Sequence, residues 1–91
     1  KTLYYVEVYG HTIIYHTQEE EISITGSRTI KQIEKELTEK GFFRCHQCFL
    51  VNLNHVKQYD KESVQIDGKE IPISRSRRKE FLQALMSHWG G

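Results

Sequence analysis

The sequence predicts a mostly β domain with one helix near its middle and a second helix at its C-terminus. Three observations predict this class: short runs of aromatic and β-branched residues bounded by turn residues, one capping-box signal, and one apolar stripe at helical spacing near the end. With 91 residues, of which 37% are apolar, the chain can bury one small core and has no room for a second. We therefore expect residues 1–91 to form one domain.

The first 25 residues predict three strands in a meander. Apolar and mixed positions alternate along Leu3–Tyr9, as in a strand with one face toward a core. Gly10 and His11 interrupt this pattern, and Thr12–Thr17 resumes it. After an acidic turn, Glu21–Thr25 is expected to form a short third strand.

The central helix is predicted by its cap and by its spacing. Thr29 and Gln32 form a candidate capping box at its start, and Gly41 is a typical residue just past a helix end. The outer face alternates Lys with Glu, as in a solvated amphipathic helix, and we assign no chemistry to it. The apolar positions are Ile30, Ile33 and Leu37.

The second half of the chain predicts further strands followed by the last helix. Strands are expected at His55–Tyr59 and Ser63–Ile66, and Asp67-Gly68 is a typical type I′ hairpin turn leading into Lys69–Ile73. The chain's single proline lies in that last strand and puts it at a sheet edge. From Ser76 onward, an apolar stripe at helical spacing predicts the C-terminal helix: Phe81, Leu82, Leu85, Met86 and Trp89.

Polar side chains interrupt the aromatic segment Phe42–Leu53. Arg44 and Gln47 are of the residue types that hydrogen-bond to base edges or grip phosphate. A basic cluster, Ser74–Lys79, follows the last predicted strand. Residues 1–41 hold five Lys or Arg against seven Asp or Glu, whereas residues 42–91 hold eight against five. Positive charge is thus placed C-terminally, and nucleic acid is the first partner to consider.

The basic cluster lies where the last helix is expected to begin. Positive charge there opposes the helix macrodipole, at a cost of roughly 0.3–1 kcal/mol for each exposed cation. Free N–H groups at a helix start, together with several cations, form a good phosphate site, and a polyanion would relieve the repulsion. A solvated Lys/Arg-rich turn explains the same residues, and the local sequence does not separate the two interpretations.

Four short segments form a pattern that spans nearly the whole chain. They are Tyr5-Val6-Glu7 followed by His11, Phe42-Phe43-Arg44-Cys45-His46, Phe49-Leu50-Val51-Asn52-Leu53, and Ile71-Pro72-Ile73-Ser74-Arg75. In this order and spacing the pattern resembles the LytTR DNA-binding domain, usually the C-terminal output half of bacterial response regulators such as the accessory-gene and virulence regulators of Gram-positive bacteria. The resemblance implies a LytTR-like domain over residues 1–91 whose first strand is missing, because members usually carry about one more strand before the position of Leu3.

The resemblance also implies an architecture and a mode of binding. Small antiparallel sheets would pack as an elongated sandwich with short helices at its sides, and loops between strands, not a recognition helix, would enter successive major grooves. Carried over by position, the base-contacting residues are His11, Gln47 and Arg75. The chemistry of the side chains independently favours Gln47 and Arg75, whereas His11 depends on the resemblance alone. We expect phosphate contacts from Arg44, Ser74, Arg77, Arg78 and Lys79.

These expectations predict sequence-specific binding of double-stranded DNA, as the transcription-regulating output domain of a two-component response regulator. The implied partners are promoter sites, typically in direct repeat, and an N-terminal receiver domain in the full-length protein. No cofactor is expected. We expect a cytoplasmic protein that does not enter a membrane, because no apolar run approaches the roughly 18 residues of a membrane helix and the N-terminus lacks a signal-peptide layout.

Cys45 and Cys48 give the strongest alternative, a metal or redox site. A C-x-x-C pair alone is weak evidence, because structural zinc normally takes four ligands. In an extended segment the two side chains would point to opposite faces, which prevents chelation. We therefore expect no metal and free thiols, with ordinary packing as the simplest role, and reversible oxidation of Cys45 as a candidate control of DNA binding.

Two other function classes agree less well with the sequence than DNA binding does. The sequence has no paired carboxylates near a nucleophile, no Gly-rich phosphate loop and no triad spacing, so we expect no enzyme activity. His46 and Asn52 are interpreted as structural hydrogen-bonding residues. A protein-interaction module would instead dock a partner on an exposed aromatic β edge at Leu3–Tyr9.

Overall fold

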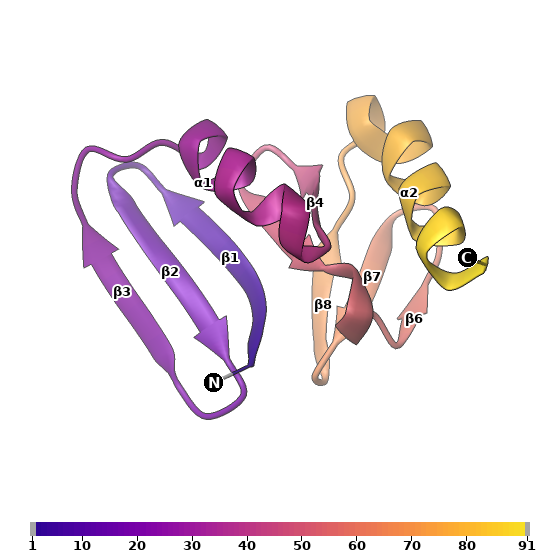
Figure 1. Ribbon diagram of the computed structural model, residues 1–91, viewed down its shortest axis with the longest axis horizontal. Coiled ribbons are helices and arrows are strands. Elements are labelled where there is room, and N and C mark those ends of the chain that lie inside the picture. Colours follow the sequence, from indigo (N-terminus) through magenta and orange to yellow (C-terminus); the bar gives the residue numbers. More distant parts are fainter. Residues whose placement is uncertain (1, 91) are drawn as a thin grey trace.

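Two antiparallel sheets build the molecule, as seen in the computed structural model, which describes residues 2–90 (Figure 1). The first has five strands in the order β3-β2-β1-β5-β4 and the second has three in the order β6-β7-β8. The principal extents are 35 × 28 × 23 Å, which agrees with the elongated mostly β architecture that the sequence predicts. The strands are β1 (Leu3–Tyr9), β2 (Thr12–Thr17), β3 (Glu21–Thr25), β4 (Phe42–His46), β5 (Phe49–Asn52), β6 (Gln58–Tyr59), β7 (Ser63–Ile66) and β8 (Lys69–Pro72).

The expected N-terminal meander is present, but its first strand is not an edge. β1 pairs with β2 on one side and with β5 on the other, with Val6 opposite Tyr15 and Leu50 respectively. The hypothesis of an exposed β edge at Leu3–Tyr9 is therefore wrong, because β5 returns more than 40 residues later to cover that side. The edge strands of this sheet are β3 and β4.

The central helix forms as its capping signal predicts. α1 (Ile30–Leu37) begins at Thr29, whose Oγ1 accepts from the Gln32 main-chain N–H at 3.3 Å while Gln32 Oε1 accepts from the Thr29 N–H at 2.8 Å. The last turn tightens into a 3₁₀ segment, η1 (Thr38–Lys40), which Gly41 ends with φ +89°. The buried face of α1 packs on the five-stranded sheet, in a small core of Val6, Ile13, Ile33 and Leu50.

The second sheet is built around the hairpin that Asp67 and Gly68 predict. Both residues have positive φ, +50° and +76°, as a type I′ turn requires, and the turn joins β7 to β8. β8 is an edge strand and ends at Pro72, again as expected. The strand expected at His55–Tyr59 is reduced to β6, because the chain first turns through the 3₁₀ segment η2 (Leu53–His55).

The main core lies between the two sheets and is closed by the C-terminal helix. This helix starts later than expected: a 3₁₀ turn, η3 (Arg75–Arg77), precedes α2 (Arg78–Gly90). Of its predicted apolar stripe, Phe81 and Leu85 are fully buried, whereas Met86 and Trp89 are 62% and 48% exposed. The buried stripe is therefore narrower than the sequence pattern indicates, and on its exposed edge the Trp89 ring contacts Tyr59 of β6 with 5.3 Å between ring centroids. Within residues 2–90, no helix combines the length and apolar character needed to cross a membrane.

Candidate nucleic-acid interface

Three connections gather at one end of the molecule, which we call the loop end. They are the β1–β2 turn at Gly10-His11, the β4–β5 turn at Gln47-Cys48, and the segment Ile73–Arg77 between β8 and α2 (Figure 1). Main-chain hydrogen bonds tie them to one another's strands: Val8 N–H donates to the Cys48 carbonyl and Ser74 N–H donates to the Cys45 carbonyl, both at 2.9 Å. The topology thus brings together the sequence regions that hold the three predicted base-contacting residues.

His11 projects from the tightest of these turns. Gly10 takes φ +54°, which lets two residues reverse the chain between β1 and β2. The His11 carbonyl accepts from the Gly26 N–H at 3.0 Å, so the turn is also fixed to the connection that precedes α1. The imidazole is exposed, and the neighbouring Tyr9 exposes 63% of its surface. The sequence alone gives Tyr9 no special role, because it is one residue of an alternating strand pattern.

Gln47 is exposed on a turn that is held from both sides. Arg44 Nη2 donates to the Gln47 carbonyl at 3.0 Å, and the Cys48 N–H donates to His46 Nδ1 at 3.1 Å. His46 thus has the structural hydrogen-bonding role expected of it. The Gln47 side chain extends from this fixed backbone into solvent.

Arg44 is placed differently from the other predicted phosphate-contacting residues. Its side chain is only 9% exposed, and Nη1 lies 3.5 Å from Glu34 Oε1 of α1. Together with the bond to Gln47, this pairing turns the guanidinium into the protein. The geometry disfavours a phosphate contact and indicates that Arg44 supports the β4–β5 turn. The sequence does place Arg44 within an aromatic and aliphatic segment, but its partner Glu34 on α1 is visible only in the fold.

The basic cluster begins at the loop end and runs into α2. Arg75 and Lys79 are exposed, and Arg77 and Arg78 are half-buried. Within the described part of the chain, no ion pair links any of these four cations to a carboxylate. Two polar atoms of this segment, Ser74 Oγ and Arg78 Nε, are buried without a hydrogen-bond partner. The cluster therefore presents cations without a direct ion pair among the described residues, and Arg78 lines a pocket together with Asp60 and Glu62.

The two cysteines are free and sit in unlike surroundings. Cys45 is fully buried and its Sγ donates to the Pro72 carbonyl at 3.5 Å, whereas Cys48 is half-buried in the β4–β5 turn. Burial raises the pKa of the Cys45 thiol to about 12, which disfavours the thiolate that oxidation requires. Among residues 2–90, no group of three or more His, Cys, Asp or Glu side chains has the arrangement of a metal site.

Asn52 joins the start of β1 to the end of β5. Its Nδ2 donates to the Leu3 carbonyl at 2.9 Å and its Oδ1 accepts from the Asn54 N–H at 3.0 Å. Asn52 therefore bonds backbone and caps the turn into η2, as the sequence predicted.

Comparisons with known proteins agree with this architecture. Residues 1–86 match the family model described as the LytTr DNA-binding domain. The transcriptional regulatory protein YpdB of Escherichia coli is 32% identical over 91% of this chain, and the sensory transduction protein LytT of Bacillus subtilis is 35% identical over 69% of it. The chain spans 36% and 29% of those two proteins. A solved LytTr DNA-binding domain from Bacillus cereus superposes with a TM-score of 0.73 at 24% identity, covering 93% of this chain and 81% of that one.

Proposed function

The chain belongs to the LytTR family of DNA-binding domains, and on that premise we propose that it binds double-stranded DNA sequence-specifically as the transcription-regulating output domain of a two-component response regulator. One observation carries the proposal: three fixed turns share the loop end with a basic cluster that forms no direct ion pair among residues 2–90. Fixed backbones with exposed polar side chains suit base readout, and free cations suit phosphate.

Three side chains read bases in this proposal. Arg75 directs its guanidinium fork to guanine O6 and N7, and Gln47 pairs with adenine N6 and N7. His11 contacts a base from the β1–β2 turn. Because the three side chains come from different connections, each is expected to read a separate position of the site.

The remaining cations set affinity and register. Lys79 is exposed, and Arg77 and Arg78 become available to phosphate through modest side-chain movement from their half-buried positions. Ser74 Oγ and Arg78 Nε have no hydrogen-bond partner among the described residues, so each side chain can turn outward to a phosphate oxygen without breaking a bond. Arg44 contributes indirectly, by holding the turn that carries Gln47.

The wider context of the domain is proposed from its relatives. A transcriptional regulatory protein and a sensory transduction protein align with it over about a third of their length. We propose that an N-terminal receiver domain completes the full-length protein and that promoter sites in direct repeat are its targets. The family is one of regulatory DNA-binding domains, and the proposed activity is binding without catalysis.

Selection of bound sites from randomised duplexes tests the proposal directly. The expected result is a recurrent sequence motif bound at least about a thousandfold more tightly than random duplex at physiological salt. Affinity for the selected site should fall steeply as salt rises. Enrichment of no motif, together with salt-independent binding, would contradict the proposal.

A further inference from the structure

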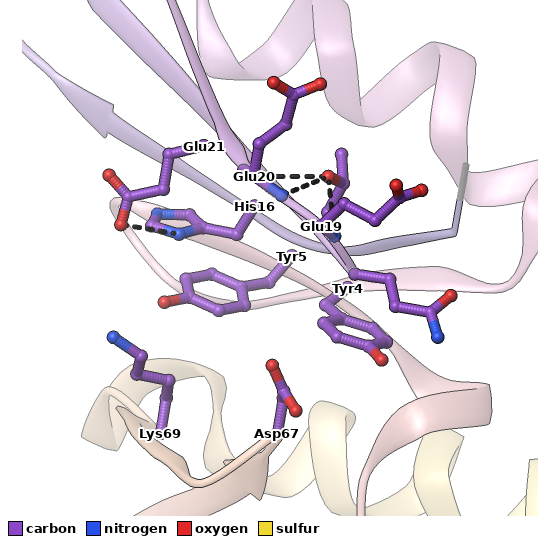
Figure 2. A pocket seen from close by; sticks show the side chains of 10 residues that line it. Tyr4, Tyr5, His16, Glu19, Glu20, Glu21, Asp67 and Lys69 are labelled. Carbon is purple, nitrogen blue, oxygen red and sulfur yellow. Dashed lines mark hydrogen bonds and ion pairs between the residues drawn. The ribbon is translucent and has the colours of Figure 1, made fainter.

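A second surface feature lies at the opposite end of the molecule from the loop end. A pocket of about 190 Å³ opens where the β2–β3 turn approaches the β7–β8 hairpin (Figure 2). It begins beside Tyr4 at the start of β1, so roughly six residues of strand, about 20 Å, separate it from the Gly10 turn. The lining residues are Tyr4, Tyr5, His16, Thr17, Gln18, Glu19, Glu20, Glu21, Asp67 and Lys69.

Tyr5 forms a wall of this pocket and directs its hydroxyl group into it. The residue is only 5% exposed, and its ring stacks on His16 with 4.1 Å between ring centroids and 13° between planes. His16 is itself held by Glu7 at 2.9 Å and Glu21 at 3.5 Å. The Tyr5 hydroxyl points into the space between Glu21 and Lys69 (Figure 2) and has no hydrogen-bond partner among the described residues. The ring is thus buried while the hydroxyl faces the open pocket, where a ligand can reach it without displacing a protein partner.

The charges around the pocket favour a ligand of positive charge. Carboxylates of the β2–β3 turn and of Asp67 outnumber the single ammonium group of Lys69 along the rim. Burial first, and then the negative charges of Glu7, Glu21 and Asp67, raise the pKa of Tyr5 to about 12. The hydroxyl therefore stays protonated at neutral pH in a negative potential, and its oxygen remains available to accept a hydrogen bond from a cation.

We propose that this pocket binds the head group of an organic cation, a guanidinium or a primary alkylammonium. The N–H groups would donate to the Tyr5 hydroxyl oxygen and to the carboxylates of Glu21 and Asp67, and the Tyr4 ring offers a face for cation–π contact. The volume is below the roughly 300 Å³ of the smallest drug-sized sites, so it suits one head group and not a larger molecule. The head group belongs either to an Arg or Lys side chain of a protein partner or to a free small amine.

Titration of the ¹⁵N-labelled chain with n-propylguanidinium and n-butylammonium tests the proposal. At constant ionic strength, the amide signals of Tyr5, His16, Glu21 and Asp67 should shift and saturate, with a dissociation constant on the order of 1–10 mM for fragments of this size. A peptide with one Arg between alanines identifies the source: stronger binding by the peptide indicates a protein side chain, and binding by the free cations alone indicates a small amine. Shifts that never saturate, or that equal those of sodium chloride, would overturn the proposal.

Variants separate the pocket from general attraction of cations. Tyr5→Phe keeps the ring and removes only the unpartnered hydroxyl, so the fold should be retained while affinity falls about fivefold. Glu21→Gln should weaken binding by a similar factor. Glu39→Gln, on η1 and outside the pocket lining, removes the same charge and should leave affinity unchanged. Equal binding by Tyr5→Phe and the parent chain, or equal losses in the two Glu variants, would rule out the assigned site.

Discussion

Arg44 Nη2 donates to the main-chain carbonyl of Gln47 at 3.0 Å, across the turn that separates β4 from β5. The same guanidinium lies 3.5 Å from Glu34 of α1. A cation that resembles a phosphate ligand in the sequence thus links the helix layer to a turn at the loop end. Arg44 therefore affects DNA binding indirectly, because it fixes the backbone from which the Gln47 side chain projects.

Arg44→Met should therefore lower the free energy of unfolding and reduce discrimination between bases. The number of phosphate contacts should stay the same. Loss of the bond to Gln47 and of the pairing with Glu34 should reduce the free energy of unfolding by about 1–3 kcal/mol. The slope of log affinity against log salt should stay unchanged, because no phosphate contact is removed. Urea unfolding and fluorescence anisotropy at several salt concentrations measure the two quantities.

Lys57→Ala supplies the control for this variant, since Lys57 is an exposed cation outside the loop end. It should change neither stability nor salt dependence by a measurable amount. If Arg44→Met instead reduced the magnitude of the salt slope by about one unit, Arg44 would contact phosphate directly, and the positioning role assigned to it would be wrong.

The thiols should differ sharply in reactivity. At pH 8 the Cys45 thiol, with its pKa raised by burial to about 12, is thiolate to a far smaller extent than an ordinary thiol, so Cys48 should be alkylated first. Mass spectrometry after limited iodoacetamide treatment should find the single label on Cys48. Under reducing conditions, Cys45→Ala should bind DNA within a few-fold of the parent. If Cys45 were labelled before Cys48 in the folded protein, oxidation of Cys45 would again be a candidate control of DNA binding.

The raised Cys45 pKa also gives stability a pH dependence of defined sign. In the unfolded chain the thiol ionises near its ordinary pKa of 9.0, whereas in the folded protein it ionises near 12. The protonated thiol thus favours folding below about pH 9, and this contribution is lost as pH rises from 9 toward 12. Cys45→Ala should flatten the fall in unfolding free energy over that range, as measured by urea unfolding at stepwise pH.

Two residues of the C-terminal helix should behave oppositely although the sequence pattern treats them alike. Phe81 is fully buried and packs against Phe43 with 6.1 Å between ring centroids, so Phe81→Ala should cost about 3–5 kcal/mol of unfolding free energy. Met86 is 62% exposed, and Met86→Ala should change stability by less than about 0.5 kcal/mol. Comparable losses in the two variants, measured by urea unfolding, would mean that the exposed edge of α2 is covered in solution.

The features that the sequence predicted well are those set by neighbouring residues. The Thr29–Gln32 capping box and the Asp67-Gly68 turn depend on bonds and backbone angles within four residues, so their signals are complete in the local sequence. The position of β1 inside its sheet depends instead on β5, and the burial of Arg44 depends on Glu34. Such contacts follow from the packing of distant elements, which periodicity alone does not encode.

The residues of the candidate site also differ in whether the local sequence could predict them. Gln47 and Arg75 could be selected by side-chain chemistry, and both are exposed at the loop end. His11 required the family resemblance, because a histidine in a turn has many ordinary roles. The uneven exposure of the basic cluster could not be predicted, since half-buried Arg78, for example, lies beside Asp60 and Glu62 of the β6–β7 turn only in the folded chain.

Salt dependence should report how many cations meet phosphate. With Arg44 turned inward and Arg75 assigned to a base, three cations remain for phosphate, namely Arg77, Arg78 and Lys79, and each contributes about −0.9 to the slope of log affinity against log salt. The expected slope is thus about −3 for the selected duplex. Anisotropy titrations from 50 to 200 mM salt measure it. A slope near zero would contradict phosphate binding by the basic cluster.

Arg75 and Lys79 should separate base reading from phosphate holding. Both are exposed, but Arg75 starts η3 at the loop end, whereas Lys79 lies one turn further, inside α2. Arg75→Ala should remove about 1–3 kcal/mol of discrimination at one base pair, so that the variant tolerates substitution at that position of the operator. Lys79→Ala should weaken selected and random duplexes alike and reduce the magnitude of the salt slope by about one unit.

Gln47→Ala and His11→Ala extend this comparison to the other two turns. Each should relax specificity as Arg75→Ala does, but at a different base pair, because the three side chains leave from separate connections of the fold. Competition binding on operators with single base substitutions gives a profile for each variant, and the positions of lost discrimination can then be ordered along the site. If two variants lost discrimination at the same base pair, the one-position-per-turn arrangement would be wrong. If Arg75→Ala lost affinity equally for every duplex, Arg75 would belong with Lys79 among the residues that hold phosphate.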